Sequence, residues 1–348
     1  MRIQLKPVWV LVAVLLSAAS GSSLAGDVPS PTGSLIDIGT GKLHLRCIGS
    51  GGPSVVLEAG LGGSSLEWAS VQRSLVRIAR TCAYDRAGLG WSDATLEPRT
   101  SSKMVDELHA LLEASNVPPP YIIVAHSFGG YNAQLFARRY RDETAGVVLV
   151  DASHPEQVRR FLAPPIGVNT APSDHRRFLI LDPVRPPDTL PSRLRAVATT
   201  LAFRRKAVHA ASQELLNFRR SARQVSVANP FPEIPLVVIS RGMRMWQDSK
   251  RGRLMEELWR QLQIELSELS PLSAHLIANY SGHHVHLEQP NLVSDAIRLL
   301  LNHLSLNRSS TAWHNYDLWS RSTKAPRPRF QNATWIVNSL TPTYAWLR

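Results

Sequence analysis

One apolar run that ends abruptly at a small turn most constrains how this chain can fold. The run Ile122–Ala125 leads through His126 to Ser127, and Gly129 follows two positions later. Ala125 and Gly129 are small enough for the close backbone approach that a strained strand-to-helix turn requires. This is the pattern of a nucleophile elbow, which lifts a serine hydroxyl above a sheet. It predicts acyl-transfer chemistry at Ser127, whereas a buried strand followed by a serine-capped helix is the structural alternative.

Strand-like and helix-like segments alternate along most of the chain. The strand-like runs lie at residues 34–38, 43–48, 54–58, 121–126 and 146–150, and helix-period segments lie at 70–79 and 101–112. Continuous apolar runs are typical of parallel strands that are buried on both faces. The alternation predicts an α/β protein with a mostly parallel sheet and helices on both faces.

Residues 155–233 interrupt this alternation. They are rich in proline and arginine, contain two or three helix-like patches, and precede the next strong strand at 234–239. Because an insertion of this length exceeds an ordinary loop, we expect a helical cap over the active-site end of the sheet. The remaining core elements are expected as a helix over 252–266, a strand near 275–278 and a last helix over 292–304.

The first 25 residues have the pattern of a signal peptide. Arg2 and Lys6 precede an apolar stretch at 8–19, and a small-residue cleavage site ends at Ala25. The stretch is short for a membrane span, and a retained signal anchor is the alternative. We therefore expect an exported protein, periplasmic or secreted. The expected organisation is a signal peptide at 1–25, a first core part at 26–154, the cap at 155–233, a second core part at 234–305, and a basic, tryptophan-containing tail without an assigned role at 306–348.

The chain carries a formal net charge of +12, and arginine is concentrated between residues 159 and 223. Such an excess would suit anionic substrates or peripheral contact with an anionic membrane surface, for which the sequence offers no further support. A solvated helix surface is the interpretation we favour. Zinc-finger spacing, an RNP sequence and basic-zipper heptads are all missing from the sequence, so we do not expect nucleic-acid binding.

Acyl transfer by serine needs a general base and an acid that orients it. His283 is the expected base, because it follows a predicted strand and comes directly after the flexible Gly282. His284 and His286 are its competitors, although we expect both to lie behind the reacting groups or to face solvent. His126, beside the predicted nucleophile, is expected to pack rather than to react.

The reaction also needs hydrogen-bond donors for the oxyanion. One expected donor is the N–H of Phe128, the residue after the nucleophile, and the other is the N–H of Leu61 in the glycine-rich loop at 58–63. A plain glycine-rich turn would explain that loop equally well without Ser127. A phosphate-binding loop is disfavoured, because no Lys-Ser/Thr pair follows the glycines.

Four separated motifs resemble those of the α/β-hydrolase fold family, in the serine hydrolase branch that carries a cap after the sixth strand. They are Val56–Gly60, the Asp-x-x-Gly-x-Gly-x-Ser turn within Tyr84–Ser92, Ala125–Gly129, and Gly282-His283 followed by Glu288-x-Pro290. Together they span about residues 34–305. The resemblance implies an eight-stranded, mostly parallel sheet, with Ser127 as nucleophile and His283 as general base.

The resemblance also places the two cysteines, Cys47 and Cys82, on adjacent strands. A disulfide between them would suit an exported chain with an even cysteine count. Two unpaired thiols in the core are the alternative.

Two aspartates compete for the acid of the expected catalytic triad. Members of the family usually place it after strand seven, which here leads to Asp248, and some place it at the end of strand six, which here is Asp151. We favour Asp151, because a buried strand fixes its position, whereas Asp248 lies in a basic loop. In a third arrangement both are structural, and a backbone carbonyl or water orients the histidine.

Relatives that open epoxides or remove halides carry aspartate at the elbow, so Ser127 disfavours those reactions. We expect a serine hydrolase that cleaves a carboxylic ester or a related acyl bond in a small-molecule substrate through an acyl-enzyme. No metal or organic cofactor is expected, because no ligand cluster is visible in the sequence. The alternatives are an amidase or imino-peptidase, and a catalytically silent member of the fold that binds a small molecule or a partner. Acyl specificity and oligomeric state are not predicted.

Overall fold

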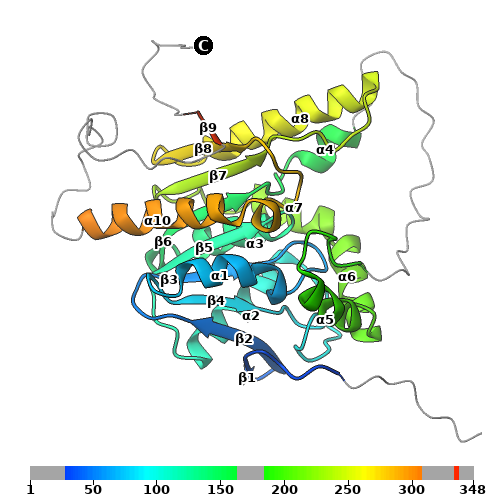
Figure 1. Ribbon diagram of the computed structural model, residues 1–348, viewed down its shortest axis with the longest axis vertical. Coiled ribbons are helices and arrows are strands. Elements are labelled where there is room, and N and C mark those ends of the chain that lie inside the picture. Colours follow the sequence, from blue (N-terminus) through cyan, green and yellow to red (C-terminus); the bar gives the residue numbers. More distant parts are fainter. Residues whose placement is uncertain (1–27, 163–183, 308–332, 337–348) are drawn as a thin grey trace, which may run out of the picture. The chain divides into compact units, whose positions relative to one another are not determined.

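The computed structural model describes residues 28–162, 184–307 and 333–336, and all elements below belong to one compact unit that starts at Pro31 (Figure 1). The expected signal peptide, and all of the tail beyond residue 307 except one strand, lie outside the described residues. The strands are β1 (Ser34–Asp37), β2 (Lys42–Ile48), β3 (Ser54–Glu58), β4 (Thr81–Tyr84), β5 (Tyr121–His126), β6 (Thr144–Val150), β7 (Leu236–Arg241), β8 (Ser273–Ala278) and β9 (Ala333–Ile336).

Helices connect these strands. They are α1 (Ala69–Leu75), α2 (Ser101–Ala114), α3 (Gly129–Arg139), α4 (Gln157–Leu162), α5 (Ser192–Ala202), α6 (Arg205–Leu216), α7 (Phe218–Ser226), α8 (Lys250–Ser267), α9 (Val285–Glu288) and α10 (Pro290–Asn307), with 3-10 turns η1 (Ser65–Trp68) and η2 (Arg141–Glu143). Each expected core helix is present, with ends that differ by a few residues from those expected.

The strands form one sheet in the order β1-β2-β4-β3-β5-β6-β7-β8-β9. Strands β3 to β8 are parallel where they pair, and β1 and β2 are antiparallel to their neighbours. These eight strands confirm the expected mostly parallel sheet, and β9, from the tail, adds a short antiparallel ninth strand beside β8. Cys47 and Cys82 lie directly opposite each other on β2 and β4 and form a disulfide, as expected.

Two hydrophobic layers hold the sheet between helices, because alternate residues of each strand point to opposite faces. On one face Val56, Ile123 and Leu149 pack with residues of α2, α3 and α7. On the other face Val55 and Ile122 pack with residues of η1, α1 and α10. Figure 1 shows α1 and α10 on the same side of the sheet. Burial on both faces explains why these strands read as continuous apolar runs.

Helices α5, α6 and α7 follow β6 and form the cap, which confirms the expected insertion after the sixth strand (Figure 1). The exact bounds expected for the cap, 155–233, stay a prediction, since residues 163–183 lie outside the described part. Within the described residues, the structure has no helix with the length and apolarity needed to cross a membrane.

Candidate active site

The turn between β5 and α3 places Ser127 at the carboxyl edge of the sheet. Its φ of 52° lies in the left-handed region, which is strained for a residue with a side chain. The Ser127 N–H donates to the carbonyl of Val150 on the neighbouring strand at 3.2 Å. A Cβ on Gly129 would lie 2.6 Å from the Ala59 carbonyl oxygen, so the helix can begin here only with glycine. This geometry is that of the predicted nucleophile elbow.

A chain of two short hydrogen bonds links Ser127 to a histidine and an aspartate. His283, in the loop between β8 and α9, has its Nε2 at 2.8 Å from Ser127 Oγ. Its Nδ1 lies 2.6 Å from a carboxylate oxygen of Asp151, which directly follows β6. The three side chains come from residues separated by up to 156 positions. The sheet brings them together, because its parallel strands end at one edge.

Asp151 is buried and is surrounded by donors. Its Oδ1 accepts from the Trp259 indole N–H at 2.7 Å and from the Arg241 main-chain N–H at 3.2 Å. The Arg241 guanidinium donates to its other oxygen at 3.0 Å. Burial alone would raise the pKa of Asp151, but the hydrogen bond from His283 and the charges of His283 and Arg241 outweigh it and lower the pKa. Asp151 is therefore held as a carboxylate beside the imidazole.

Asp248 lies in a different environment. Its side chain is 71% exposed and pairs with Arg244 and Arg253 at 3.3 Å and 2.7 Å. These ion pairs are on the surface and leave Asp248 without a contact to His283 in the described part of the chain. Of the two aspartates considered from the sequence, the structure brings Asp151 to the histidine.

The two residues expected to supply the oxyanion N–H donors, Leu61 and Phe128, border the same cavity as Ser127. Among the described residues, neither N–H donates to a protein acceptor. Phe128 directly precedes α3, so its N–H is one of the free donors at the positive end of that helix. Both groups are thus available to an anionic oxygen.

The remaining histidines of the region have other surroundings. His126 is buried and has its Nε2 at 2.9 Å from the main-chain carbonyl of His283, so it supports the loop instead of facing Ser127. Burial, together with the charges of His283 and His286, lowers the pKa of His284 to about 4. The structure gives Ser127 a hydrogen bond with His283 and none with these competitors in the part that it describes.

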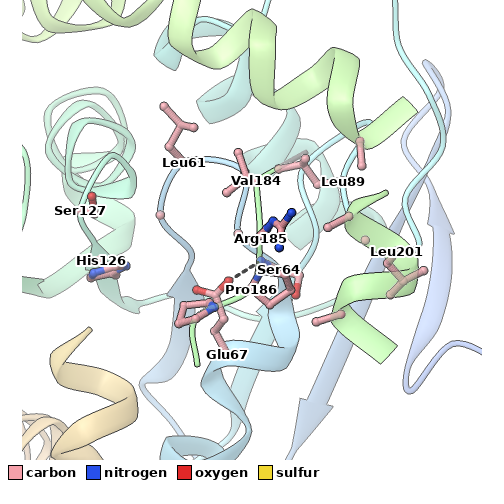
Figure 2. A pocket seen from close by; sticks show the side chains of 18 of the residues that line it. Leu61, Ser64, Glu67, Leu89, His126, Ser127, Val184, Arg185, Pro186 and Leu201 are labelled. Carbon is pink, nitrogen blue, oxygen red and sulfur yellow. Dashed lines mark hydrogen bonds between the residues drawn. The ribbon is translucent and has the colours of Figure 1, made fainter. Parts of the chain in front are cut away.

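Two cavities meet at Ser127. One, of about 200 Å³, runs between the glycine-rich loop and the cap and is bordered by Glu67, Arg185 and Leu201 (Figure 2). The other, of about 390 Å³, has a largely aromatic wall. That wall is formed by Phe161, Phe218, Met245, Trp246 and Trp259. Ser127, His283 and Leu61 border both spaces, so a substrate held at Ser127 can extend in two directions.

A buried polar network beside the glycine-rich loop was not expected from the sequence. Arg86 donates to Glu58 and Glu214, each at 2.6 Å, and to the carbonyl oxygens of Ala59 and Gly60 at 2.8 Å and 2.6 Å. Arg86 follows β4, and Glu214 belongs to the cap helix α6. In the sequence, the only indication of this network was the arginine, Arg86, within the Asp-x-x-Gly turn. Its partner Glu214 is in the cap, where no sequence motif singles it out.

A second cluster that the sequence did not reveal is formed by Glu67, His126 and His286. The nearest ligand atoms of the three side chains all lie within 4.8 Å of one another, and all three residues are buried. A carboxylate and two imidazoles are a donor set that suits a divalent transition metal. The three residues come from η1, the end of β5 and α9, which are far apart in the sequence, so no ligand spacing could indicate them.

Comparisons with known proteins agree with this architecture. A sequence model of the alpha/beta hydrolase fold matches residues 53–179. The uncharacterized protein YqjL of Bacillus subtilis is 28% identical over 283 residues, which cover 81% of this chain and 90% of that protein. An AB hydrolase superfamily protein of Gibberella zeae is 29% identical over 278 residues, which cover 72% of this chain and 86% of that protein. The chain has the α/β-hydrolase fold, and its sequence is similar to members of that fold family.

Solved structures show the same fold. A thermophilic esterase from Thermogutta terrifontis aligns with a TM-score of 0.54 and 20% identity, over 76% of this chain and 94% of the esterase chain. The enol-lactonase from Burkholderia xenovorans aligns with a TM-score of 0.52 and 20% identity, over 77% of this chain and all of the lactonase chain (100%). At such identities the likeness concerns the fold alone.

Proposed function

We propose that this protein is a serine hydrolase that cleaves a carboxylic ester or a related acyl bond of a small molecule. The observation that carries the proposal is the continuous hydrogen-bonded chain from Ser127 Oγ through His283 to Asp151. Such a chain activates a serine, because the imidazole accepts the hydroxyl proton while the carboxylate stabilises the imidazolium that forms. The esterase and the lactonase that share the fold are compatible with this reaction class.

In the proposed cycle, Ser127 Oγ attacks the substrate carbonyl carbon as its proton passes to His283 Nε2. The carbonyl oxygen becomes an oxyanion, and the N–H groups of Phe128 and Leu61 donate to it. His283 then gives the proton to the leaving alcohol oxygen, which departs and leaves an acyl-enzyme. Water, deprotonated by His283, attacks the acyl carbon, and the acid product leaves with Ser127 reprotonated.

The two cavities support a two-part substrate. The larger one has a wall of aromatic rings, with Phe161, Trp246 and Trp259 in edge or tilted contact with one another. Aromatic and bulky apolar groups would bury their surface there. Since the guanidinium of Arg241 is already paired with Asp151 and Glu256, it does not require an anionic substrate.

A fluorophosphonate probe tests the proposal, because it reacts covalently only with an activated serine. We expect labelling of the wild type and hydrolysis of p-nitrophenyl esters, with both lost in Ser127→Ala and kcat lower by a factor on the order of 10⁶. The matched control is Ser305→Ala, an exposed serine on α10, which should label normally. Labelling that persists in Ser127→Ala would contradict the proposal.

Two alternatives have distinct outcomes in the same assay. If the folded wild type neither reacts with the probe nor turns over any ester, the protein is a catalytically silent binding member of the fold. If the probe labels Ser127 but only amide or amino-terminal proline substrates are cleaved, the enzyme is an amidase or imino-peptidase. Both outcomes are read on protein whose circular dichroism shows it to be folded.

We also propose that the protein is exported. The Cys47–Cys82 disulfide supports this, since disulfides persist in oxidising compartments. Fractionation of cells that express the full chain tests it. Recovery of the chain in the cytoplasm, with both thiols reduced, would contradict export.

A further inference from the structure

We propose that Glu67, His126 and His286 form a binding site for a divalent transition-metal ion, with Zn²⁺ as the best-suited ion. This site is separate from the hydrogen-bonded chain of Ser127, and the proposal does not depend on the hydrolase reaction. The three side chains converge from η1, from the end of β5 and from α9.

The distances are close to those of a bound site. A carboxylate oxygen of Glu67 and Nε2 of His286 are 3.5 Å apart, and all three ligand atoms lie within 4.8 Å of one another. Two ligands at about 2.1 Å from one ion can be at most about 4.2 Å apart. In the tetrahedral geometry that Zn²⁺ prefers the separation is about 3.4 Å, so binding would draw the widest pair together by up to about 1.4 Å, which side-chain rotation can supply.

His126 is oriented as a metal ligand usually is. Its Nε2 lies at 2.9 Å from the main-chain carbonyl oxygen of His283 and can only donate to it, so the proton of the neutral ring is on Nε2. Nδ1 then presents a lone pair, and it has no hydrogen-bond partner among the described residues. Metal-ligating histidines typically donate their second ring nitrogen to a carbonyl or carboxylate in this way.

His286 gives the second independent observation. It is fully buried, and within the described part of the chain neither of its ring nitrogens has a hydrogen-bond partner. Its Nε2 is 3.5 Å from the Glu67 carboxylate, so an ion between the two would satisfy this nitrogen together with the Nδ1 of His126, which has no partner among the described residues. A cation accepts lone pairs from both rings at once, and the Glu67 carboxylate offsets its charge.

The site has an approach for the ion and room for a further ligand. Glu67 and His126 also border the smaller cavity, as Figure 2 shows, so an ion and its remaining water can reach them from there. Three protein ligands and one water complete the four-coordinate geometry that Zn²⁺ prefers. A carboxylate with two imidazoles suits Zn²⁺ better than Mg²⁺ or Ca²⁺, which prefer oxygen.

A bound ion would join three segments that surround Ser127. Glu67 follows the glycine-rich loop, His126 immediately precedes Ser127, and His286 is three residues after His283. We therefore expect the ion to stiffen the main chain of the site. A rise in the unfolding temperature on metal binding is the expected result, because the ion binds the folded state and the unfolded chain lacks the site.

The test is a titration of chelator-treated protein with Co²⁺, followed by visible absorption, and with Zn²⁺, followed by calorimetry. We expect one equivalent to bind, with the intense visible bands of four-coordinate Co²⁺ and a higher unfolding temperature. Glu67→Gln and His286→Asn should each weaken binding by at least about 10- to 100-fold, the loss that even an outer-sphere partner causes. Glu67→Gln keeps the side-chain volume and guards against a variant that fails to fold.

His284→Asn is the matched control, since His284 is two residues from His286 but does not belong to the cluster. It should bind the ion as the wild type does. Absence of stoichiometric binding by the folded wild type would overturn the proposal. Buried water would then be the partner of these polar atoms. Binding that survives both Glu67→Gln and His286→Asn would place the ion elsewhere and would overturn it as well.

Discussion

Arg86 and Glu214 form a buried ion pair across 128 residues of sequence, with Nε and Oε1 only 2.6 Å apart. The pair connects the turn after β4 to the cap helix α6. The same Glu214 carboxylate accepts from the Gly62 N–H at 2.8 Å, and the same guanidinium donates to the Gly60 carbonyl at 2.6 Å. Because Leu61 lies between these two glycines, the cap holds one proposed oxyanion donor in place.

Replacement of Glu214 by alanine should therefore lower kcat. A displacement of the loop by about 1 Å costs on the order of 10²-fold in rate, and breaking one side of a buried ion pair costs about 3–5 kcal/mol of stability. Glu214→Gln keeps an acceptor for Gly62 and should lose less. Steady-state kinetics and urea unfolding measure the two effects, with the exposed Glu233→Ala as control. An unchanged kcat in a folded Glu214→Ala protein would show that the glycine-rich loop keeps its position without Glu214.

The choice between the two aspartates is tested by a matched pair of variants. Asp151→Asn should lower kcat by about 10⁴-fold, because an amide cannot stabilise the imidazolium and can reverse the histidine tautomer. Asp248→Asn should leave kcat near the wild-type value, since Asp248 is exposed and pairs with the surface arginines Arg244 and Arg253. If Asp248→Asn is the slower of two folded variants, the assignment of Asp151 is wrong.

The disulfide should contribute to stability by restricting the unfolded chain. Cys47 and Cys82 are 35 residues apart, and closing a loop of that length corresponds to about 4 kcal/mol. We expect Cys47→Ser with Cys82→Ser to lower the free energy of unfolding by up to that amount, measured by urea denaturation. The reductant-treated wild type should behave like the double variant. Equal stability of the oxidised wild type and the variant would exclude a stabilising role.

Acid should destabilise the protein through His275, a buried residue of β8 that is hydrogen-bonded to Ser240. Burial lowers the pKa of His275 to about 4, whereas the unfolded value is about 6.5. Between these values the unfolded chain binds the proton and the folded protein does not, so stability falls as the pH falls. The loss that His275 causes at about pH 5 is about 2 kcal/mol relative to about pH 7.5.

Urea unfolding at these two pH values, compared with His275→Gln, measures that contribution. Glutamine keeps a hydrogen-bonding group for Ser240 but does not titrate, so the variant should lose about 2 kcal/mol less on acidification. Carboxylates titrate in both proteins and cancel in the comparison. An identical pH dependence of the two proteins would contradict the buried neutral histidine.

The sequence by itself determined the parts of this protein that depend on local chemistry. The apolar run before Ser127 and the small residues around it predict a buried strand and a tight turn, because burial on both faces and close backbone approach restrict each position separately. The glycine before His283 and the length of the cap insertion are signals of the same kind.

Only the tertiary structure decided which distant side chains meet. Asp151 and Asp248 are both plausible from the sequence, and the choice depends on which strand end faces His283. The cluster of Glu67, His126 and His286 was missed, because its members belong to η1, β5 and α9, which are far apart in the sequence and share no ligand spacing. Contacts of this kind follow from strand order and register, and these emerge when the whole chain buries its two hydrophobic layers together.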